Sequence, residues 1–421
     1  MLRIENVRLF TGRETFADGC VLINDSGRIE YAGALSGCPE TVGCKQMYGG
    51  GGILMPGFYN AHSHAAMVLM RGVGSDLTLM NWLHQIFPIE DKLSGELVYW
   101  GSMLAIQEML RRGVVAFADM YFFMDHVARA AIETGIRLNM VRGCTDVAGV
   151  ESVPALHEEF HDAVRGTIKV YMGLHAEYTS TEEVASRAIA VAKQLNTGFH
   201  VHLSETRGEV EGSFDRRGKS PVQYFYDLGA FERPTIAAHC VHLDDNDIKI
   251  LAKTGVYAVH NPASNLKLAS GIAPVHKYLK SGMKVALGTD GASSNNRLDM
   301  LSDMRLASIL QKGAFGNPTL LPAKQAIEMA TRTGALAMGF DDCGLLEKGM
   351  QADMILLDGN SENLSIAPDL PAAIVYGAQG LNVSMTMVAG RILYKDGQFM
   401  TLMPERVKER AMEAARKIGV I

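Results

Sequence analysis

The sequence has 421 residues, of which 48% are hydrophobic and 20% are charged, which predicts a globular protein with one large domain and one smaller domain. Its formal net charge of −6 at pH 7 argues against a nucleic-acid-binding surface. No uninterrupted apolar stretch is long enough to cross a membrane, and the N-terminal residues lack the apolar core of a signal peptide. The six cysteines form no Cys-x-x-Cys pair, which predicts reduced thiols in a cytoplasmic protein. They are Cys20, Cys38, Cys44, Cys144, Cys240 and Cys343.

Short apolar runs alternate with turn residues over roughly the first 55 residues. The runs at 7–10, 20–23 and 28–33 are each bounded by turn residues such as Thr11-Gly12. This pattern is typical of a β-meander. A run of four glycines at 49–52 then marks a boundary.

From about residue 53, short β-type runs alternate with longer helical patterns. The predicted strands lie at 52–60, 114–119, 137–142, 168–175, 198–203, 235–239, 256–260 and 284–289. Helical patterns, such as 96–112, 125–134 and 181–195, separate most of these strands. This α/β order favours a closed (β/α)8 TIM-like barrel over an open doubly wound sheet. The lack of a Gly-x-Gly-x-x-Gly motif after the first strand weighs against a dinucleotide-binding fold.

The short-strand pattern returns after about residue 345, with apolar runs at 354–357 and 383–388. We therefore expect both chain ends to combine into one small β-sandwich domain, formed by residues 1–55 and 345–400. This domain would flank the barrel, which is formed by residues 56–344. Residues 401–421 have the spacing and charge of a helical segment.

Two histidines one residue apart, His62 and His64, follow a Pro-Gly bend near the end of the first predicted barrel strand. In an extended segment the side chains at i and i+2 lie on the same face, so both imidazoles can reach a single point. Such a pair forms half of a transition-metal site. Alone the signal is weak, because two solvated surface histidines can have the same spacing.

Further candidate ligands lie at the ends of other predicted strands. His202 lies near the end of the fifth strand with Glu205 just beyond it, His239 ends the sixth, and Asp290 follows the eighth. In a parallel barrel the active site forms from the strand C-termini and the loops that follow them. We therefore expect these groups on one rim with the histidine pair. The alternative is a set of structural histidines and a helix-capping aspartate.

Chemistry narrows the expected ligands to three imidazoles and one carboxylate, a set that suits zinc or ferrous iron and leaves a place for water. These ligands are His62, His64, His202 and Asp290. A bound metal lowers the pKa of its water toward neutrality, and Asp290 is placed to accept the proton. Glu205 would pass a proton to the substrate, and His239 would polarise the attacked centre or hold the hydroxide. His200 shares the strand face of His202, and alternation alone does not choose between them.

At these residues the chain resembles the metal-dependent amidohydrolase superfamily, over nearly its whole length. The match includes Pro56-Gly57-Phe58 leading into the histidine pair, the rim residues, and the split β domain. Within the superfamily it looks like the branch of 5′-methylthioadenosine/S-adenosylhomocysteine deaminases. The stretches that carry this narrower match are 81–83 with 87–90, 261–271 and 288–296.

The resemblance implies one divalent metal ion, zinc or alternatively iron, bound by the four ligands named above. It selects His202 over His200, because the family ligand is followed by x-x-Glu. It assigns Glu205 to the purine ring and to proton transfer, and His239 to assisting the attacked carbon. Asp290 is also expected to face the substrate.

The resemblance also implies substrate contacts outside the metal site. Trp82 and Glu90 would contact the nucleoside, with Glu90 on the ribose hydroxyls, and Arg142 and His175 match substrate-binding positions. The alternatives are a packing tryptophan, a glutamate in a solvated charged turn, and an arginine in a structural ion pair. His260 also ends a strand, but no role follows from its spacing; hydrogen bonding behind the site is one alternative.

Two features qualify the match. Relatives often have a His-x-Pro-Tyr pattern where this chain has His175-Ala176-Glu177-Tyr178, which affects the expected shape of the loop after the fourth strand. No lysine is placed to form a bridging carbamate, because Lys169 begins the fourth strand and is expected to point away. One metal is therefore favoured over two.

The expected function is metal-dependent hydrolytic deamination of an adenosine-type nucleoside to the inosine analogue and ammonia. Candidate substrates are 5′-methylthioadenosine, S-adenosylhomocysteine, 5′-deoxyadenosine and adenosine. One alternative is another aminated ring, such as guanine, cytosine or a triazine-like compound; the other is a non-catalytic metal-binding scaffold. The expected partner is a small nucleoside, without nucleic acid or membrane. Because relatives are often oligomeric, a homo-oligomer is also considered.

Overall fold

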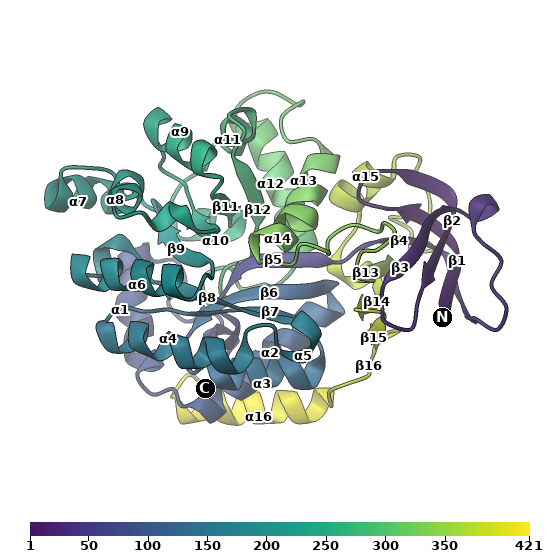
Figure 1. The fold of residues 1–421 in the computed structure, drawn as a ribbon, viewed down its shortest axis with the longest axis horizontal. Helices are drawn as coiled ribbons and strands as arrows, with labels where there is room; N and C mark the ends of the chain where they lie inside the picture. The colour runs from purple at the N-terminus through teal and green to yellow at the C-terminus, as the bar shows by residue number, and fades with distance from the viewer.

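The computed structural model describes residues 1–421 and contains two eight-stranded sheets (Figure 1). One sheet is parallel throughout, runs in sequence order and is surrounded by helices, which confirms the predicted TIM-like barrel. Its strands are β5 (Phe58–Ser63), β6 (Val114–Tyr121), β7 (Arg137–Arg142), β8 (Ile168–Leu174), β9 (Phe199–Leu203), β10 (Thr235–His239), β11 (Tyr257–His260) and β12 (Lys284–Leu287).

The first and last barrel strands meet just beyond the end of β12. The backbone N–H of Asp290 donates to the carbonyl of His62 at 3.0 Å. Beside this bond, the Asn60 amide donates to the Thr289 hydroxyl at 2.7 Å and accepts from the Thr289 N–H at 2.9 Å. The barrel is therefore closed by polar groups that adjoin two of the predicted metal ligands.

The predicted first barrel strand at 52–60 is wrong in one respect, because the structure divides this apolar run between the two sheets. Residues up to Pro56 belong to β4 of the other sheet, and the barrel begins at Phe58. Gly57 separates them. A Cβ atom at Gly57 would lie 2.3 Å from the Val115 side chain, so only glycine allows this close passage beside β6.

Both chain ends build the second sheet, in the order β16-β15-β14-β13-β4-β1-β2-β3, as the predicted terminal β domain requires. In Figure 1 its purple and yellow segments lie side by side. Its strands are β1 (Leu2–Phe10), β2 (Thr15–Ile23), β3 (Ile29–Ala34), β4 (Lys45–Pro56), β13 (Met354–Leu357), β14 (Val383–Val388), β15 (Arg391–Lys395) and β16 (Gln398–Phe399). The predicted meander is the antiparallel series β1-β2-β3. A separate core of 13 buried residues packs within this part of the chain.

A buried ion pair joins the two sheets. Asp353, just before β13, accepts from the Arg137 guanidinium at 2.6 and 3.0 Å. The same carboxylate accepts from the Tyr59 hydroxyl at 2.5 Å and from the Ala389 N–H at 2.7 Å. Burial alone would raise the pKa of Asp353, but the charge and hydrogen bonds of Arg137 outweigh it and keep the pKa low.

The helices include α1, which the sequence pattern did not predict, and α16, which fulfils the expectation of a helical end. They are α1 (Leu79–Glu90), α2 (Gly95–Arg111), α3 (Met124–Thr134), α4 (Val147–Phe160), α5 (Ala163–Gly166), α6 (Glu182–Gln194), α7 (Arg207–Arg217), α8 (Pro221–Asp227), α9 (Asp245–Thr254), α10 (Pro262–Lys267), α11 (Val275–Lys280), α12 (Met300–Ala314), α13 (Ala323–Ala330), α14 (Arg332–Ala337), α15 (Leu370–Ala372) and α16 (Pro404–Lys417). Helix α16 packs on α2 beneath the barrel (Figure 1). The division into 1–55 plus 345–400, 56–344 and 401–421 stays a proposal.

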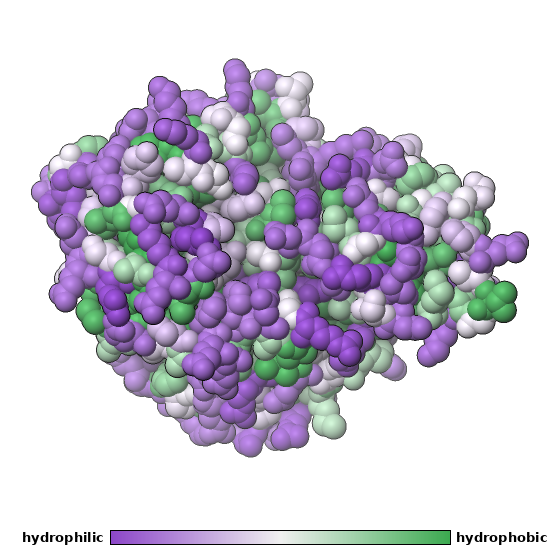
Figure 2. Space-filling view, in the orientation of Figure 1, coloured by the Kyte–Doolittle hydropathy of each residue, from purple (hydrophilic) through white to green (hydrophobic).

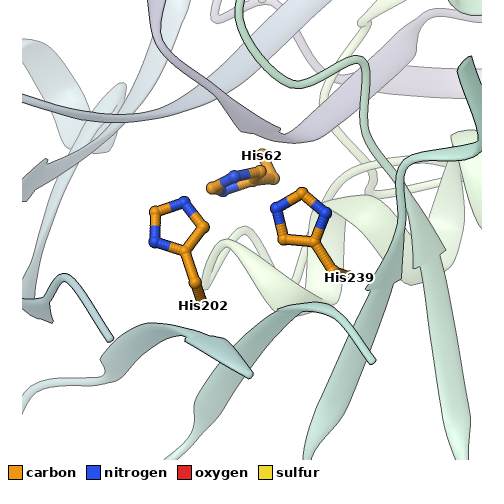
Figure 3. A group of neighbouring side chains, drawn as sticks. All are labelled: His62, His202 and His239. Carbon is orange, nitrogen blue, oxygen red and sulfur yellow. The ribbon is translucent and has the colours of Figure 1, made fainter. Parts of the chain in front are cut away.

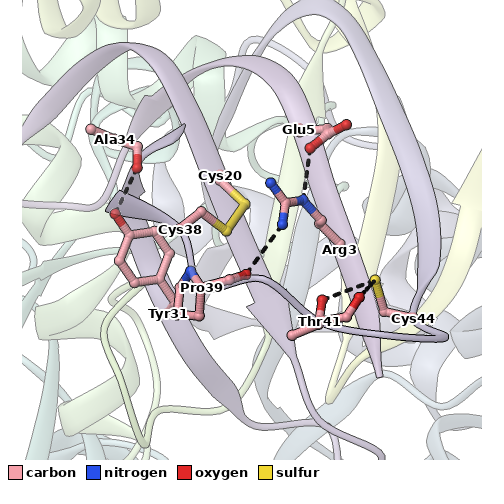
Figure 4. Close-up of a disulfide and its surroundings, with 9 residues drawn as sticks. All are labelled: Arg3, Glu5, Cys20, Tyr31, Ala34, Cys38, Pro39, Thr41 and Cys44. Carbon is pink, nitrogen blue, oxygen red and sulfur yellow. Dashed lines mark hydrogen bonds and ion pairs between the residues drawn. A yellow bond between two sulfur atoms is a disulfide. The ribbon is translucent and has the colours of Figure 1, made fainter. Parts of the chain in front are cut away.

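The expectation of six reduced thiols is wrong for two cysteines. Cys20 on β2 and Cys38, just after β3, form a disulfide with their Cα atoms 6.3 Å apart (Figure 4). The β2–β3 hairpin brings them together across 18 positions, a proximity that scattered spacing does not reveal. The other four cysteines are free.

Hydrophilic side chains cover most of the face shown in Figure 2, and the hydrophobic residues on it form small scattered groups. The structure contains no helix that combines the length and the apolar character needed to span a bilayer.

Candidate active site

A cavity of about 780 Å³ opens at the rim formed by the C-terminal ends of the barrel strands. Most of the predicted site residues line it. These are His64, Trp82, Glu90, Arg142, His175, His202, Glu205, His239 and Asp290. His62 lies directly beneath, fully buried. The structure therefore brings the sequence-predicted residues together around one cavity.

Five side chains converge at the floor of this cavity. Two groups have ligand atoms that all lie within 4.8 Å of one another: His62 with His202 and His239, and His62 with His64 and Asp290. Figure 3 shows the first group, with three imidazoles facing a common space. The Nε2 atoms of His64 and His202 are 3.4 Å apart, and Asp290 Oδ1 lies 3.1 Å from His64 Nε2.

Three of these imidazoles are held through Nδ1, which directs Nε2 into the centre. His64 Nδ1 donates to the Met120 carbonyl at 2.6 Å, and His202 Nδ1 donates to the His175 carbonyl at 2.7 Å. His62 Nδ1 lies 3.0 Å from His200 Nε2. Hydrogen bonding at one ring nitrogen fixes the tautomer that leaves the other nitrogen free to bind a metal.

The donor set fits a divalent transition metal. His62 Nε2 is buried and has no hydrogen-bond partner, although it points at the other donors. Burial lowers the pKa of His62 to about 3 and also lowers the pKa of His202, so both rings are neutral, as metal ligands must be. For His64, burial opposes the charged form, but the hydrogen bond and charge of Asp290 outweigh it and raise the pKa to about 9. A metal ion therefore competes with the proton that His64 and Asp290 share.

Asp290 is fixed by its backbone and by two serines. Its Oδ2 accepts from the Ser264 hydroxyl at 2.5 Å and from the Ser294 hydroxyl at 2.7 Å, which leaves Oδ1 for the centre. Asp290 has φ of 62°, in the left-handed region that non-glycine residues rarely adopt. His239, with φ of 72°, shares this strain. Such strain persists where the surrounding structure enforces it, commonly at active sites.

Glu205 lies opposite the ligand cluster, in a buried position. It accepts from the Ser270 hydroxyl at 2.9 Å, and its Oε2 lies 3.7 Å from His239 Nε2. Burial raises its pKa above the ordinary glutamate value, and the nearby charge of Asp290 adds to the effect, against the opposing charge of His239. A carboxyl group with a raised pKa is suited to donate a proton near neutral pH.

A second buried carboxylate, Glu209, holds the segment that carries Glu205. It accepts the backbone N–H of Ser204 at 2.8 Å and that of Glu205 at 2.7 Å. Ser204 has φ of 52°, so the chain turns sharply at this point. His239 has an equivalent support, because its Nδ1 donates to Asn265 Oδ1 at 2.8 Å.

His200 and His260 lie outside the cavity. His200 is fully buried under His62, on the same strand face as His202 but one pair of residues further from the rim. His260 is 2% exposed, and neither of its ring nitrogens has a hydrogen-bond partner. Lys169 starts β8 and pairs with Asp162 at the surface, far from the rim end of the strand, as expected.

The predicted substrate residues line the cavity wall. Trp82 and Glu90 come from α1, and the Trp82 indole N–H is buried without a partner. Arg142 ends β7 and makes no ion pair, and its Nε is also unpartnered. His175 follows β8 and is oriented by a 3.0 Å hydrogen bond between Nδ1 and the Thr179 hydroxyl. Burial lowers the pKa of His175 to about 4, so this ring is neutral.

The sequence pattern did not identify several residues that shape the site. Tyr121, at the end of β6, donates its hydroxyl to Glu90 at 2.6 Å. The predicted strand stopped two residues short of it, at 119. Asn265, Ser270 and Glu209 were not singled out either, although Asn265 and Ser270 lie within the 261–271 stretch that carried the resemblance.

Glu177 stands where relatives often have proline, and two arginines pair with it. It is 1% exposed and pairs with Arg216 at 2.5 Å and with Arg217 at 3.0 Å, both near the end of α7. The loop after β8, which also carries His175, is therefore tied to α7 by a charge cluster. A proline at this position has no side chain for such a contact.

Comparisons with known proteins agree with this geometry. The profile of the amidohydrolase family matches residues 53–393. The 5-methylthioadenosine/S-adenosylhomocysteine deaminase of Moorella thermoacetica is 43% identical over 407 residues, covering 95% of each chain. The crystal structure of an adenosine deaminase from Xanthomonas campestris with bound zinc superposes with a TM-score of 0.94 at 30% identity, covering 100% of this chain and 99% of that one. The zinc complex of atrazine chlorohydrolase from Arthrobacter aurescens has a TM-score of 0.92 at 23% identity, covering 99% and 100%, and shows likeness of fold alone.

Proposed function

Because this chain belongs to the amidohydrolase family, we propose that its rim cavity is the active site of a hydrolytic deaminase for adenosine-type nucleosides. The products are the corresponding inosine analogue and ammonia. The enzyme is therefore a hydrolase that acts on a C–N bond. The candidate substrates are 5′-methylthioadenosine, S-adenosylhomocysteine, 5′-deoxyadenosine and adenosine.

We propose that one zinc ion is held by three imidazoles and one carboxylate, with iron as the alternative. The ligands are His62, His64, His202 and Asp290. When bound, such an ion supplies Lewis acidity that lowers the pKa of water. The close approach of the His64 and His202 Nε2 atoms, and of Asp290 Oδ1 to His64 Nε2, supports this set. We assign His239 to the substrate instead, because its Nε2 lies 3.7 Å from Oε2 of the proposed proton donor Glu205.

The protein side chains carry the protons in this proposal. Asp290 accepts the proton of the attacking water through Oδ1, while its Oδ2 stays hydrogen-bonded to the two serines. Glu205 gives its proton to the ring nitrogen beside the attacked C6, which lets that carbon accept the new C–O bond. His239 is assigned here as an imidazolium, whose Nδ1–H stays on Asn265 Oδ1 while its Nε2–H donates to the oxygen that becomes negative on the tetrahedral carbon. Asp290 then returns its proton to the amine, the C–N bond breaks and ammonia leaves. The hydroxyl proton on C6 passes to Glu205, which forms the C6=O bond of the product and restores the protonated carboxyl group.

The cavity wall supplies the substrate contacts in the same proposal. The unpartnered N–H groups of Trp82 and Arg142 are donors that await polar atoms of a ligand. Glu90 accepts the ribose hydroxyls, and neutral His175 contacts the purine from the β8 side. Apolar side chains of α1 and the β6 loop, among them Leu83 and Phe122, leave room for a 5′ substituent.

The observation that carries the proposal is a buried Glu205 with a raised pKa, facing a cluster of four potential metal ligands across one cavity. An ammonia-release screen of the four candidate nucleosides, with zinc and iron measured in the same sample, tests it. We expect turnover with at least one of them and about one metal per chain. Turnover of guanine, cytosine or a triazine alone would assign the site to another ring, and bound metal without turnover on any compound would indicate a non-catalytic scaffold.

We further propose that the protein works in the cytoplasm on small nucleosides, without nucleic-acid or membrane partners, and that it forms a homo-oligomer. Four free cysteines fit a reducing compartment, whereas the Cys20–Cys38 disulfide is uncommon there. Cell fractionation tests the location: recovery of the protein in the cytosolic fraction supports the cytoplasm, and recovery in another fraction contradicts it. Light scattering gives the subunit number.

A further inference from the structure

The Glu90 carboxylate is held in an unfavourable electrostatic position. It is the last residue of α1, where the negative end of the helix dipole disfavours an anion. Asp91 adds a second negative charge next to it, while Lys92 turns away to the carbonyl of Ile418. Burial raises the pKa of Glu90, which further disfavours its charged form.

One side-chain hydrogen bond opposes these effects, and the charge of His64 acts in the same direction. The Tyr121 hydroxyl donates to Glu90 Oε1 at 2.6 Å, a length typical of a strong bond to a carboxylate, and no other hydrogen bond to the Glu90 side chain is present. Tyr121 is 3% exposed, so its ring is fixed by packing at the end of β6. The preceding residue, Met120, holds His64 through its carbonyl. One strand end therefore fixes both the proposed metal centre and the Glu90 carboxylate, and so the spacing between them.

The hydrogen bond leaves Glu90 with free acceptor sites that face the cavity. A carboxylate offers about four lone-pair positions on two oxygens, and Tyr121 occupies one of them. The others can accept two neighbouring hydroxyl groups, as a ribose diol presents them. A carboxylate free to rotate would instead turn toward water, because α1 provides it with no other donor.

We infer that Tyr121 is a positioning residue for substrate specificity: it acts through Glu90 to make the enzyme select nucleosides that carry both ribose hydroxyls. This inference rests on the proposed function and adds a residue to it. Tyr121 is needed for binding the sugar and has no part in proton transfer at the base. Its loss therefore weakens selection between sugars more than it slows the chemical step.

The test compares adenosine with 2′-deoxyadenosine in the metal-loaded wild type and in Tyr121→Phe, which removes only the hydroxyl oxygen. We expect KM for adenosine to rise about tenfold or more with kcat changed less than about threefold, and the preference for adenosine in kcat/KM to fall by about tenfold. The inhibition constants of inosine and 2′-deoxyinosine give the same comparison without turnover. Metal content and Tm show that each variant is folded.

A second variant shows whether Tyr121 acts through Glu90. Glu90→Gln removes the charge, and Tyr121→Phe added to it should change the sugar preference by less than about twofold, since the path is already broken. Tyr99→Phe is the matched control, because its hydroxyl makes the same type of bond, to Glu133 at 2.7 Å, outside the cavity. That variant should behave as wild type.

The outcomes separate the two proposals. If the wild type deaminates no adenosine-type compound, the proposed function fails and the inference falls with it. If the wild type prefers adenosine and Tyr121→Phe keeps that preference, or if the Tyr121 and Glu90 effects are additive, the inference alone is wrong.

Discussion

Glu205 is the proposed proton donor, and its buried position changes the pKa of its carboxyl group. Glu205 is 4% exposed, and burial raises the pKa of its carboxyl group. We predict that Glu205→Gln lowers kcat by about 10²–10⁴-fold, the usual contribution of a general acid or base. Metal content should be unchanged, because Glu205 is not a proposed ligand. The measurement is the absorbance change on deamination; full activity in this variant would exclude the proton-transfer role. Glu211→Gln, at an exposed position nearby, is the control.

Glu209 supports Glu205 without touching the cavity. In Glu209→Gln an amide NH2 replaces one of the two carboxylate oxygens. One of the two backbone N–H groups therefore loses its acceptor and faces another donor. We predict a loss of about 1–3 kcal/mol in the free energy of unfolding, the cost of an unsatisfied buried donor. A drop in kcat at unchanged metal content should accompany it. Urea denaturation measures the first and steady-state kinetics the second; unchanged values for both would contradict the supporting role.

Sequence spacing identified the convergent residues but not their supports. His62 and His64 were found because i and i+2 share a face in any extended segment. His202, His239 and Asp290 were found because they lie near, at or just beyond the ends of predicted strands. Asn265, which orients His239 from another loop, has no such signature, since its partner lies 26 positions away. The positive φ angles of Ser204, His239 and Asp290 are equally invisible, because none of the three is a glycine.

At the scale of elements, the sequence predicted the number and order of the barrel strands but not where the first one begins. The run at 52–60 is apolar throughout, so its periodicity does not separate β4 from β5. The division depends on Gly57 passing Val115, which is a contact in three dimensions. Helix α1 was missed because Pro88 lies inside it, and proline normally ends a helix.

The loop after β8 is tied to α7 through the buried carboxylate of Glu177. Glu177→Gln should cost about 1–2 kcal/mol, because Arg216 is 44% exposed and can be solvated when its partner is neutral. Replacing Arg216 and Arg217 together by methionine should cost more, about 3–5 kcal/mol, since it leaves a buried carboxylate without a counter-charge. Chemical denaturation of both variants measures this asymmetry, and equal costs would contradict it. Limited proteolysis of the 175–180 loop should follow the same order.

At the scale of the molecule, the Arg137–Asp353 pair couples the barrel to the terminal sheet. Both side chains are almost fully buried, so Asp353→Asn leaves the guanidinium charge uncompensated. We predict a loss of about 3–5 kcal/mol in stability, with kcat of the folded fraction at low temperature close to wild type. Differential scanning calorimetry and kinetics on the same sample measure both, and a stable Asp353→Asn variant would show that the pair does not couple the sheets.

A second whole-molecule property is the dependence of stability on pH. Asp303 on α12 is 1% exposed, and burial raises its pKa to about 8. The folded protein thus keeps a proton on Asp303 that the unfolded chain releases near its ordinary value of 3.8. Stability is therefore lost as pH rises from that value toward 8, by up to about 1.4 kcal/mol per pH unit from this group.

The Asp303→Asn variant isolates the contribution of Asp303 to the pH dependence of stability. Between pH 5 and about 8, Tm of the wild type should fall more steeply than that of Asp303→Asn, which has no proton to lose. Asp341→Asn, at an exposed position, should follow the wild type. Parallel pH profiles for the wild type and Asp303→Asn would contradict the assignment.

The seam between β5 and β12 also sets the order of events during synthesis. Asn60 and Thr289, which fasten it, are 229 positions apart, so a ribosome adding about 5–20 residues per second makes the second roughly 10–45 s after the first. Until then β5 is an unpaired edge that carries His62 and His64 without Asp290, and an open edge invites association with other chains. The nascent protein therefore passes through a period in which two of the proposed metal ligands lie on an open sheet edge, and barrel closure both covers that edge and brings Asp290 beside them.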